Sequence, residues 1–173
     1  MAAFRVTPGI ESDLASIVAI YNHYVLHTAV TFDTAPFDSA SRKPWFDRFG
    51  QDPRHRLLVA VDDASTKGDR SILGYASSGP FHAKPAYGTS VETSIYVRAG
   101  CERQGIGSTL YTRLFDELRD SGAHRAYAGI TQPNDASVKL HERFGFVLAA
   151  RYGEVGWKLG RFWDVHWFEK RLG

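Results

Sequence analysis

The sequence predicts one mixed α/β domain spanning residues 1–173, and three observations support this. The 173 residues are 43% hydrophobic, enough to bury one core but too few for two domains of ordinary size. Short apolar runs typical of strands alternate with segments whose apolar residues recur at helical spacing. The early strands are expected to form antiparallel hairpins, and the later ones to be joined by helices as in βαβ units.

The chain is expected to begin with a short strand and an amphipathic helix. Phe4 and Val6 indicate the strand, which should end near Pro8. Ser12 and Asp13 can cap the helix, because their side-chain oxygens accept hydrogen bonds from its first free N–H groups. One broad apolar face follows at helical spacing and consists of Leu14, Ile17, Val18, Ile20, Tyr21, Tyr24 and Val25.

The rest of the first half is expected to supply a second helix and a hairpin. The predicted elements are a loop over residues 27–36, a helix from Ser39 to Phe49, and strands from Arg56 to Val61 and from Ile72 to Ser78. The stretch from Asp62 to Asp69 is polar and contains Gly68, so it is predicted to be the hairpin turn.

Strands and helices alternate in the second half. The predicted elements are strand Val91–Val97, loop Gly100–Gly107, helix Ser108–Arg119, strand Arg125–Thr131, helix Asn134–Arg143, strand Phe146–Arg151 and strand Phe162–Glu169. Gly145 follows the last helix and is a typical helix stop.

Composition and charge exclude several classes of protein. The formal net charge is +2, so nothing indicates the concentrated basic surface that nucleic-acid binding needs. The apolar runs are only as long as strands, which predicts no membrane span, and no signal peptide is expected at the N-terminus. Cys101 is the single cysteine, which excludes an intrachain disulfide and suits a cytoplasmic location. The histidines form no spaced cluster, so no metal site is expected.

A glycine-containing loop between a strand and a helix is the first functional motif. Glycines let backbone N–H groups turn toward an anion, and the following helix N-terminus adds partial positive charge, so a pyrophosphate is a natural ligand. On the glycines alone, a plain strand–helix turn is about equally well supported. The residues of the loop are Arg103, Gln104, Gly105, Ile106, Gly107 and Ser108.

A second motif, from Asn134 to Phe146, reads as a helix cap, a helix, a glycine stop and a strand. Together the two motifs resemble the GCN5-related N-acetyltransferase (GNAT) superfamily. Its pyrophosphate loop has the form Arg/Gln-x-x-Gly-x-Gly/Ala, and its later helix the form Asn-x-x-Ala/Ser-x-x-Leu-Tyr followed by Gly-Phe. The matching positions are Gly105, Gly107, Asn134, Ser137, Leu140, Gly145 and Phe146. Two positions depart: Glu102 stands at the Arg/Gln position, and His141 at the Tyr position.

The sequence is most similar to the phosphinothricin and methionine sulfoximine N-acetyltransferase branch. The similar segments are Ile20–Val25, Thr31–Phe32, Tyr87–Val97, Gly107–Tyr111, Pro133–Ser137 and Val155–Val165. This resemblance implies a strongly twisted, mixed central sheet flanked by helices. It also implies acetyl transfer from acetyl-CoA to the primary amine of a small amino-acid-like molecule. The strands Val91–Val97 and Arg125–Thr131 should then separate to admit the pantetheine arm.

The resemblance assigns Glu92 as the general base, because an ammonium must lose a proton before it can attack a thioester. Without the resemblance, a surface or core-edge ion pair would be the commoner role of such a glutamate. The backbone of Ile95, Tyr96 and Val97 is expected to bind the pantetheine amides and the oxyanion, while their side chains are expected to be core.

His141 is expected either to protonate the departing thiolate or to be a structural helix residue, with equal support for each. Asn134 is expected to cap its helix and also to bind the pantetheine arm, with Ser137 on the same side. Cys101 is a weak candidate nucleophile, because direct transfer needs none.

For the substrate, the resemblance indicates Phe32 as a wall of the pocket, and Lys84 and Tyr87 as further contacts. Lys84 could bind the substrate carboxylate and is expected to face one cavity with Glu92. The aromatic segment from Gly156 to Trp167 is expected to form a homodimer contact, although a core strand would explain it equally well. Acetylation of protein N-termini or lysines, and a non-catalytic acyl-CoA-binding module, are the alternatives.

Overall fold

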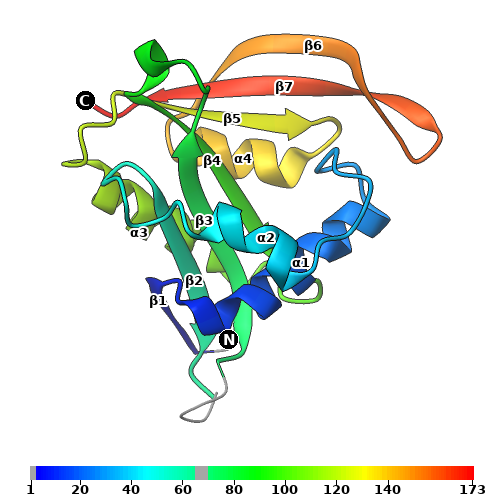
Figure 1. The fold of residues 1–173 in the computed structure, drawn as a ribbon. Coiled ribbons are helices and arrows are strands. Elements are labelled where there is room, and N and C mark those ends of the chain that lie inside the picture. The colour runs from blue at the N-terminus through cyan, green and yellow to red at the C-terminus, as the bar shows by residue number, and fades with distance from the viewer. Residues whose placement is uncertain (1–2, 65–69) are drawn as a thin grey trace.

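The computed structural model describes residues 3–64 and 70–173, and its described part forms a seven-stranded sheet flanked by four α-helices (Figure 1). The strands are β1 (Phe4–Pro8), β2 (Arg56–Asp62), β3 (Ile72–Pro80), β4 (Ser90–Val97), β5 (Arg125–Thr131), β6 (Val147–Lys158) and β7 (Arg161–Arg171). The helices are α1 (Leu14–His27), α2 (Ser39–Phe46), α3 (Ile106–Leu118) and α4 (Asp135–Arg143), with 3-10 turns η1 (Glu11–Asp13) and η2 (Pro85–Tyr87).

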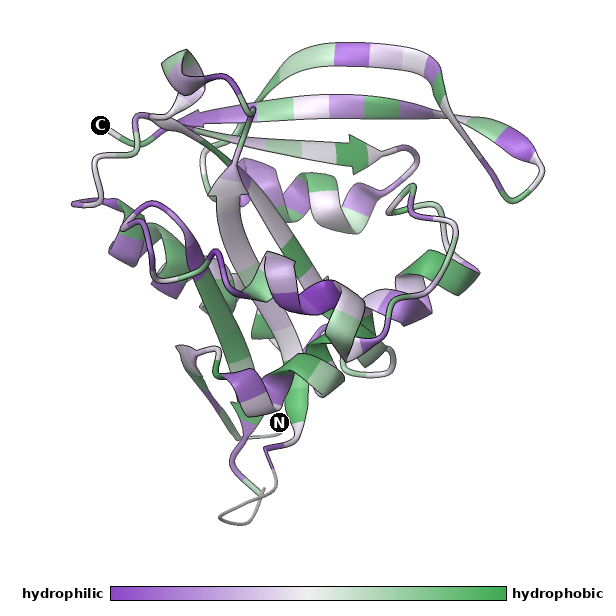
Figure 2. Ribbon diagram, in the orientation of Figure 1, coloured by the Kyte–Doolittle hydropathy of each residue, from purple (hydrophilic) through white to green (hydrophobic). Residues whose placement is uncertain are grey.

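The sheet has the strand order β1-β2-β3-β4-β5-β7-β6, in which only β4 and β5 run parallel among the described strand pairs. Strand β2 is buried on both faces and is a continuous hydrophobic strand in Figure 2. Leu58 and Ala60 belong to the core beneath α3, whereas Leu57, Val59 and Val61 belong to the core beneath α1. This alternation follows from the two-residue period of a strand and places α1 and α2 on one face, α3 and α4 on the other.

The parallel pair β4–β5 opens partway along its length. Its pairing runs from Ser90↔Arg125 to Glu92↔Tyr127 and ends there. Beyond Glu92, β4 continues to pair only with β3, and β5 only with β7. The Thr93 hydroxyl still donates a hydrogen bond of 3.3 Å to the Tyr127 carbonyl oxygen, but from there on a gap in the pairing divides β4 from β5, which confirms the predicted separation of these two strands.

The β6–β7 hairpin extends past the end of β5 (Figure 1). Pairing of β5 with β7 ends at Thr131↔Val165, while β6 and β7 continue to Lys158↔Arg161. The hairpin carries most of the large exposed apolar side chains of the described residues, namely Val147, Leu148, Tyr152, Val155, Trp157, Leu159 and Phe162.

Some predicted boundaries are wrong. Helix α2 ends at Phe46 rather than Phe49, and α3 begins at Ile106 rather than Ser108. Strand β6 continues to Lys158 rather than stopping at Arg151, because a register shift between Tyr152 and Gly156 hides the alternating pattern from the sequence. Residues 65–69 of the predicted hairpin turn lie outside the described residues.

Among the described residues, no helix is long and apolar enough to cross a membrane. In the same part of the chain, no group of three or more His, Cys, Asp or Glu side chains is placed to hold a metal ion.

Candidate active site

Glu92 lies at the last paired position before β4 and β5 separate. It is opposite Tyr127 of β5 on one side and Gly79 of β3 on the other. A Cβ atom added at Gly79 would meet nothing within 4 Å, so the space beside Glu92 is open. Burial raises the pKa of the Glu92 carboxyl above its ordinary value. A carboxylate with a raised pKa beside open space is suited to exchange protons with a ligand.

The Glu92 side chain lines a cavity of about 210 Å³. This volume is below the roughly 300–1,000 Å³ of pockets for drug-sized ligands, so it suits a small ligand. The wall opposite the sheet comes from α2 and the chain that follows it. The lining residues are Trp45, Arg48, Phe49, His55, Ser77, Gly79, Pro80, Glu92 and Ser94. We name this space the Glu92 cavity.

Side-chain packing fixes the part of β4 that borders the gap. Ile95 and Val97 pack against the core beneath α3, as predicted. Tyr96 is enclosed by tyrosines, with its ring centroid 5.2 Å from that of Tyr21 and 5.4 Å from that of Tyr75. The Tyr24 hydroxyl donates a hydrogen bond of 2.6 Å to the carbonyl oxygen of Val97. The side chains are thus structural, and the backbone edge of β4 faces the gap.

The glycine loop turns tightly into α3. Gly105, the N-cap of α3, has a φ of +83°, a left-handed conformation that favours glycine. A Cβ atom at Gly107 would lie 3.4 Å from Leu140 Cδ2 and 3.5 Å from Ile95 Cδ1, so this glycine permits close packing of α3 against β4 and α4. The first N–H groups of α3 have no partner within the helix and are free to bind an anion.

Several charged side chains surround this loop, including Glu102, which departs from the family pattern. Glu102 is exposed and accepts a hydrogen bond of 3.1 Å from the Gly100 N–H, so its carboxylate is held within the loop. Arg103 and Gln104 follow, with Arg103 exposed. From α4, Arg143 donates a hydrogen bond of 3.2 Å to the Ser108 hydroxyl, which brings a cation to the start of α3. The sequence motifs gave no signal for Arg143.

His141 is buried and fully hydrogen-bonded. Its Nδ1 lies 2.8 Å from the Ser137 carbonyl oxygen, and a carbonyl can only accept, so Nδ1 carries the proton. Nε2 then accepts from the Tyr111 hydroxyl at 2.9 Å. Burial lowers the pKa of His141, and the hydrogen bond to the Ser137 backbone partly offsets this shift by raising it. This geometry favours the structural role of His141 over the general-acid role. Both roles stay predictions.

Asn134 caps α4, as the sequence predicts. Its Oδ1 accepts a hydrogen bond of 3.2 Å from the Ser137 N–H. The amide nitrogen of the Asn134 side chain remains available as a donor. Cys101 is partly buried and packs against the core beneath α3.

The three predicted substrate residues do not line the Glu92 cavity. Lys84 is exposed and precedes η2, and its backbone N–H donates a hydrogen bond of 3.1 Å to His82 Nδ1. It is not among the residues that line the Glu92 cavity, and its role in binding the substrate stays a prediction. Tyr87 contacts Phe81, whose ring stacks on Tyr127 with centroids 4.3 Å apart, beside the point where the strands separate.

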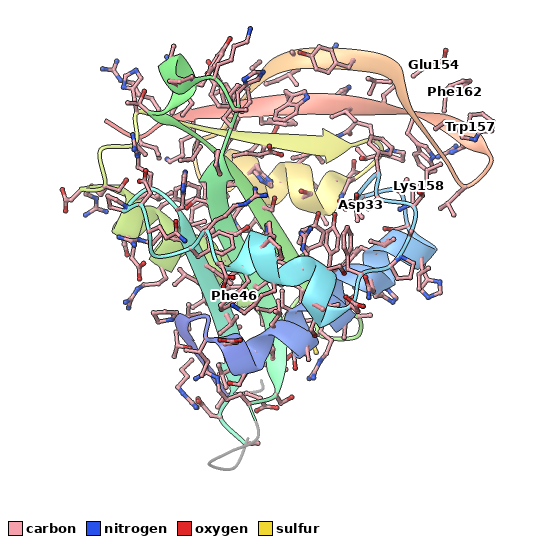
Figure 3. All side chains as sticks on the ribbon, viewed as in Figure 1. Asp33, Phe46, Glu154, Trp157, Lys158 and Phe162 are labelled. Atoms are coloured by element: carbon pink, nitrogen blue, oxygen red, sulfur yellow. The ribbon has the colours of Figure 1, made fainter. Side chains whose placement is uncertain are left out.

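Phe32 lies instead against the C-terminal hairpin. A Cβ atom at Gly156 would fall 2.3 Å from Phe32 Cζ, so the ring rests directly on the glycine backbone. Next to it, Lys158 donates a hydrogen bond of 2.7 Å to the Thr31 carbonyl oxygen. Figure 3 shows Asp33 and Lys158 close together where this loop meets the hairpin. The loop and the hairpin are therefore one packed unit.

Two strands that separate beside a helix N-terminus suit a long ligand with amide groups and a pyrophosphate, which is the chemistry of coenzyme A. The fold and the site therefore define a coenzyme A-dependent N-acetyltransferase. A family model described as "Acetyltransferase (GNAT) family" matches residues 17–146. The chain belongs to this family.

Within this family, the chain is similar over most of its length to several named N-acetyltransferases. The chain is 53% identical over 171 residues to a phosphinothricin N-acetyltransferase of Streptomyces coelicolor, covering 99% of this chain and 98% of that one. It is 34% identical over 162 residues to an L-methionine sulfoximine/L-methionine sulfone acetyltransferase of Salmonella typhimurium, covering 94% and 91%. A GNAT superfamily phosphinothricin acetyltransferase of Sinorhizobium meliloti, solved in complex with acetyl-CoA, superposes with a TM-score of 0.90 at 28% identity, covering 98% and 89%.

Proposed function

We propose that this protein transfers the acetyl group of acetyl-CoA to the primary amine of a small amino-acid-like substrate of the phosphinothricin or methionine sulfoximine/sulfone type. The observation that carries the proposal is the position of Glu92, which lies in a small cavity at the point where β4 and β5 separate. The names of the relatives support the substrate class.

The described residues fit acetyl-CoA. The free edge of β4 over Ile95, Tyr96 and Val97 would pair with the pantetheine amides, and the Asn134 side-chain amide would donate to the same arm. The N–H groups of residues 105–108 would bind the pyrophosphate, with Arg103, Gln104 and Arg143 around it. When bound, acetyl-CoA supplies the acetyl group as a thioester.

Glu92 would bind the substrate ammonium and remove one proton from it, directly or through a water molecule. The proton passes to the Glu92 carboxyl, and the amine becomes a neutral nucleophile. Burial raises the pKa of Glu92, so the carboxylate accepts this proton more readily than an exposed glutamate would. The backbone N–H groups of Ile95–Val97 would stabilise the charge that develops on the carbonyl oxygen.

We also propose that the protein acts in the cytoplasm as a homodimer, joined through the β6–β7 hairpin. Trp157 and Phe162 lie at the end of the hairpin, 60% and 56% exposed, and their rings contact each other (Figure 3). Such exposed apolar surface is typical of an interface. Light scattering should give the mass of two chains for the wild type and of one chain for Phe162→Glu. A wild-type mass of one chain at micromolar concentration would exclude this dimer.

The proposal is tested by measuring CoA release from acetyl-CoA with a panel of amines. The panel contains L-phosphinothricin, L-methionine sulfoximine and L-methionine sulfone, together with peptides that offer a free N-terminus or a lysine. Turnover with the amino acids and none with the peptides is expected. Turnover with peptides alone would favour a protein acetyltransferase. Binding of acetyl-CoA without turnover of any amine would favour an acyl-CoA-binding module.

A further inference from the structure

The Glu92 cavity contains two basic side chains that the proposed mechanism does not use. Arg48 follows the end of α2, and His55 lies just before β2. Both line the same cavity as Glu92, which comes from the opposite wall. A carboxylate therefore borders one part of this small space and two basic groups border another.

Arg48 is free to bind a ligand. Within residues 3–64 and 70–173, its guanidinium forms no ion pair or hydrogen bond, although most other arginines are bonded. The carboxylates nearest in sequence are already paired. Asp47 bonds to Lys43, and Asp52 makes a two-pronged pair with Arg54, with bonds of 2.8 and 2.6 Å.

His55 complements Arg48. Burial is the main cause that lowers the pKa of His55; the Asp52 carboxylate opposes this shift, and the positive charges of Arg54 and Arg48 add to it, so the neutral form of the ring is favoured. A neutral imidazole offers one N–H donor without adding a second full charge. Ser77 and Ser94 supply hydroxyls on the sheet side of the cavity, and Trp45 and Phe49 supply an apolar wall.

We infer that Arg48 and His55 bind the α-carboxylate of the acceptor, so the cavity selects zwitterionic α-amino acids. An α-amino acid carries its ammonium and its carboxylate on one carbon, and the cavity offers Glu92 to the first and Arg48 to the second. A guanidinium can hold a carboxylate with two parallel hydrogen bonds, which a lysine cannot. The inference rests on the proposed function and replaces Lys84 as the carboxylate ligand.

The test compares two acceptors that differ by this carboxylate: L-methionine sulfone and 3-(methylsulfonyl)propan-1-amine. The sulfone side chain is neutral, so the carboxylate is the only anionic group. We expect Arg48→Gln to raise KM for methionine sulfone by about 10- to 100-fold and His55→Phe by about 2- to 10-fold. Activity of both variants on the carboxylate-free amine should stay within a factor of about two, which also shows that the variants are folded. Arg48→Lys should recover part of the loss.

Arg119→Gln is the matched control, because Arg119 is an exposed arginine at the end of α3 that pairs with Asp116. An unchanged KM for methionine sulfone in Arg48→Gln would overturn the inference, as would a rise in KM confined to Lys84→Gln. A wild type that acetylates neither acceptor nor any other amine would instead defeat the proposed function.

Discussion

Two titratable side chains on opposite faces of the sheet, Glu92 and His141, respond to the same cause and end in different states. Burial raises the pKa of Glu92 and lowers that of His141, so it favours the neutral form of each. Glu92 borders an open cavity, whereas His141 is 3% exposed and bonds through both ring nitrogens.

The difference shows that a shifted pKa does not by itself indicate catalysis. A group acts on a ligand only if the ligand can reach it and its polar atoms are free. His141 has its N–H committed to the Ser137 carbonyl and its other nitrogen to the Tyr111 hydroxyl. Glu92 stands where a substrate could enter, so we expect Glu92 to control the rate and His141 to control stability.

The largest expected effect is the loss of activity in Glu92→Gln. The amide cannot accept a proton, so kcat/KM for the acetylated amine should fall by about 10²- to 10³-fold. The dissociation constant for acetyl-CoA, measured by calorimetry, should stay unchanged, because the proposed contacts with acetyl-CoA do not include Glu92.

Glu142→Gln is the control for this change, because Glu142 is an exposed glutamate on α4. It should retain wild-type kcat/KM. If Glu92→Gln retained it as well, Glu92 would not be the base, and the contrast with His141 would disappear.

An intermediate effect is expected on stability when the His141 pair is broken. His141→Leu removes one hydrogen-bond partner of the buried Tyr111 hydroxyl, which also bonds to the Thr93 side chain, so the free energy of unfolding should fall by about 0.5–1.5 kcal/mol. Urea denaturation measures this change, and the turnover rate of the folded variant should change by less than about threefold.

The double variant Tyr111→Phe/His141→Leu removes both polar groups and should recover part of the lost stability, because the hydroxyl that lost one of its partners is then absent and the Thr93 hydroxyl keeps its bond to the Tyr127 carbonyl oxygen. If a stable His141 variant instead lost turnover by about a hundredfold or more, the general-acid role would be restored.

The smallest expected effect concerns the pH dependence of stability. The pKa of Glu92 is higher in the folded than in the unfolded protein, so the folded state binds the proton more tightly. The stability gained from this tighter proton binding is fully present below the pKa that Glu92 has in the unfolded protein. It is lost as the pH rises through the higher pKa that Glu92 has in the folded protein. Glu92→Gln does not suffer this loss, so its melting temperature should exceed that of the wild type at pH 7–8.

That advantage should shrink as the pH falls through the raised pKa of Glu92 in the folded protein, and it should be gone below about 4.3, the ordinary pKa of glutamate. Thermal unfolding of both proteins across this range measures it. A lower melting temperature for Glu92→Gln at neutral pH would indicate that Glu92 stabilises the fold rather than serving catalysis at the expense of stability.

The sequence predicted much of the fold because several elements carry local signals. The apolar run from Leu57 to Val61 identifies β2, and the predicted strand Arg125–Thr131 has the same bounds as β5. The predicted strand ended before β6 does, because Gly153 and Gly156 interrupt the alternating pattern. The need for a glycine at position 156 follows only from its contact with Phe32. Such a contact joins distant parts of the chain and leaves no local signal.

The candidate site was less predictable for the same reason. Glu92, the glycine loop and Asn134 follow from motifs of adjacent residues. Arg48 and His55 line one cavity with Glu92 only because α2 and the chain that follows it pack over the sheet. The state of His141 depends on Tyr111 of another helix, so the motif placed the residue but could not show whether its ring was free.

The central claim, that Glu92 is the base, is tested most directly by comparing two titrations of the wild type. One is the ¹³C chemical shift of the Glu92 side-chain carboxyl, assigned with Glu92→Gln, and the other is the acid limb of kcat/KM for the best amine of the panel. We predict that both midpoints coincide and lie above the ordinary pKa of glutamate. A Glu92 midpoint at the ordinary value, or an acid limb that follows a different group, would contradict the account.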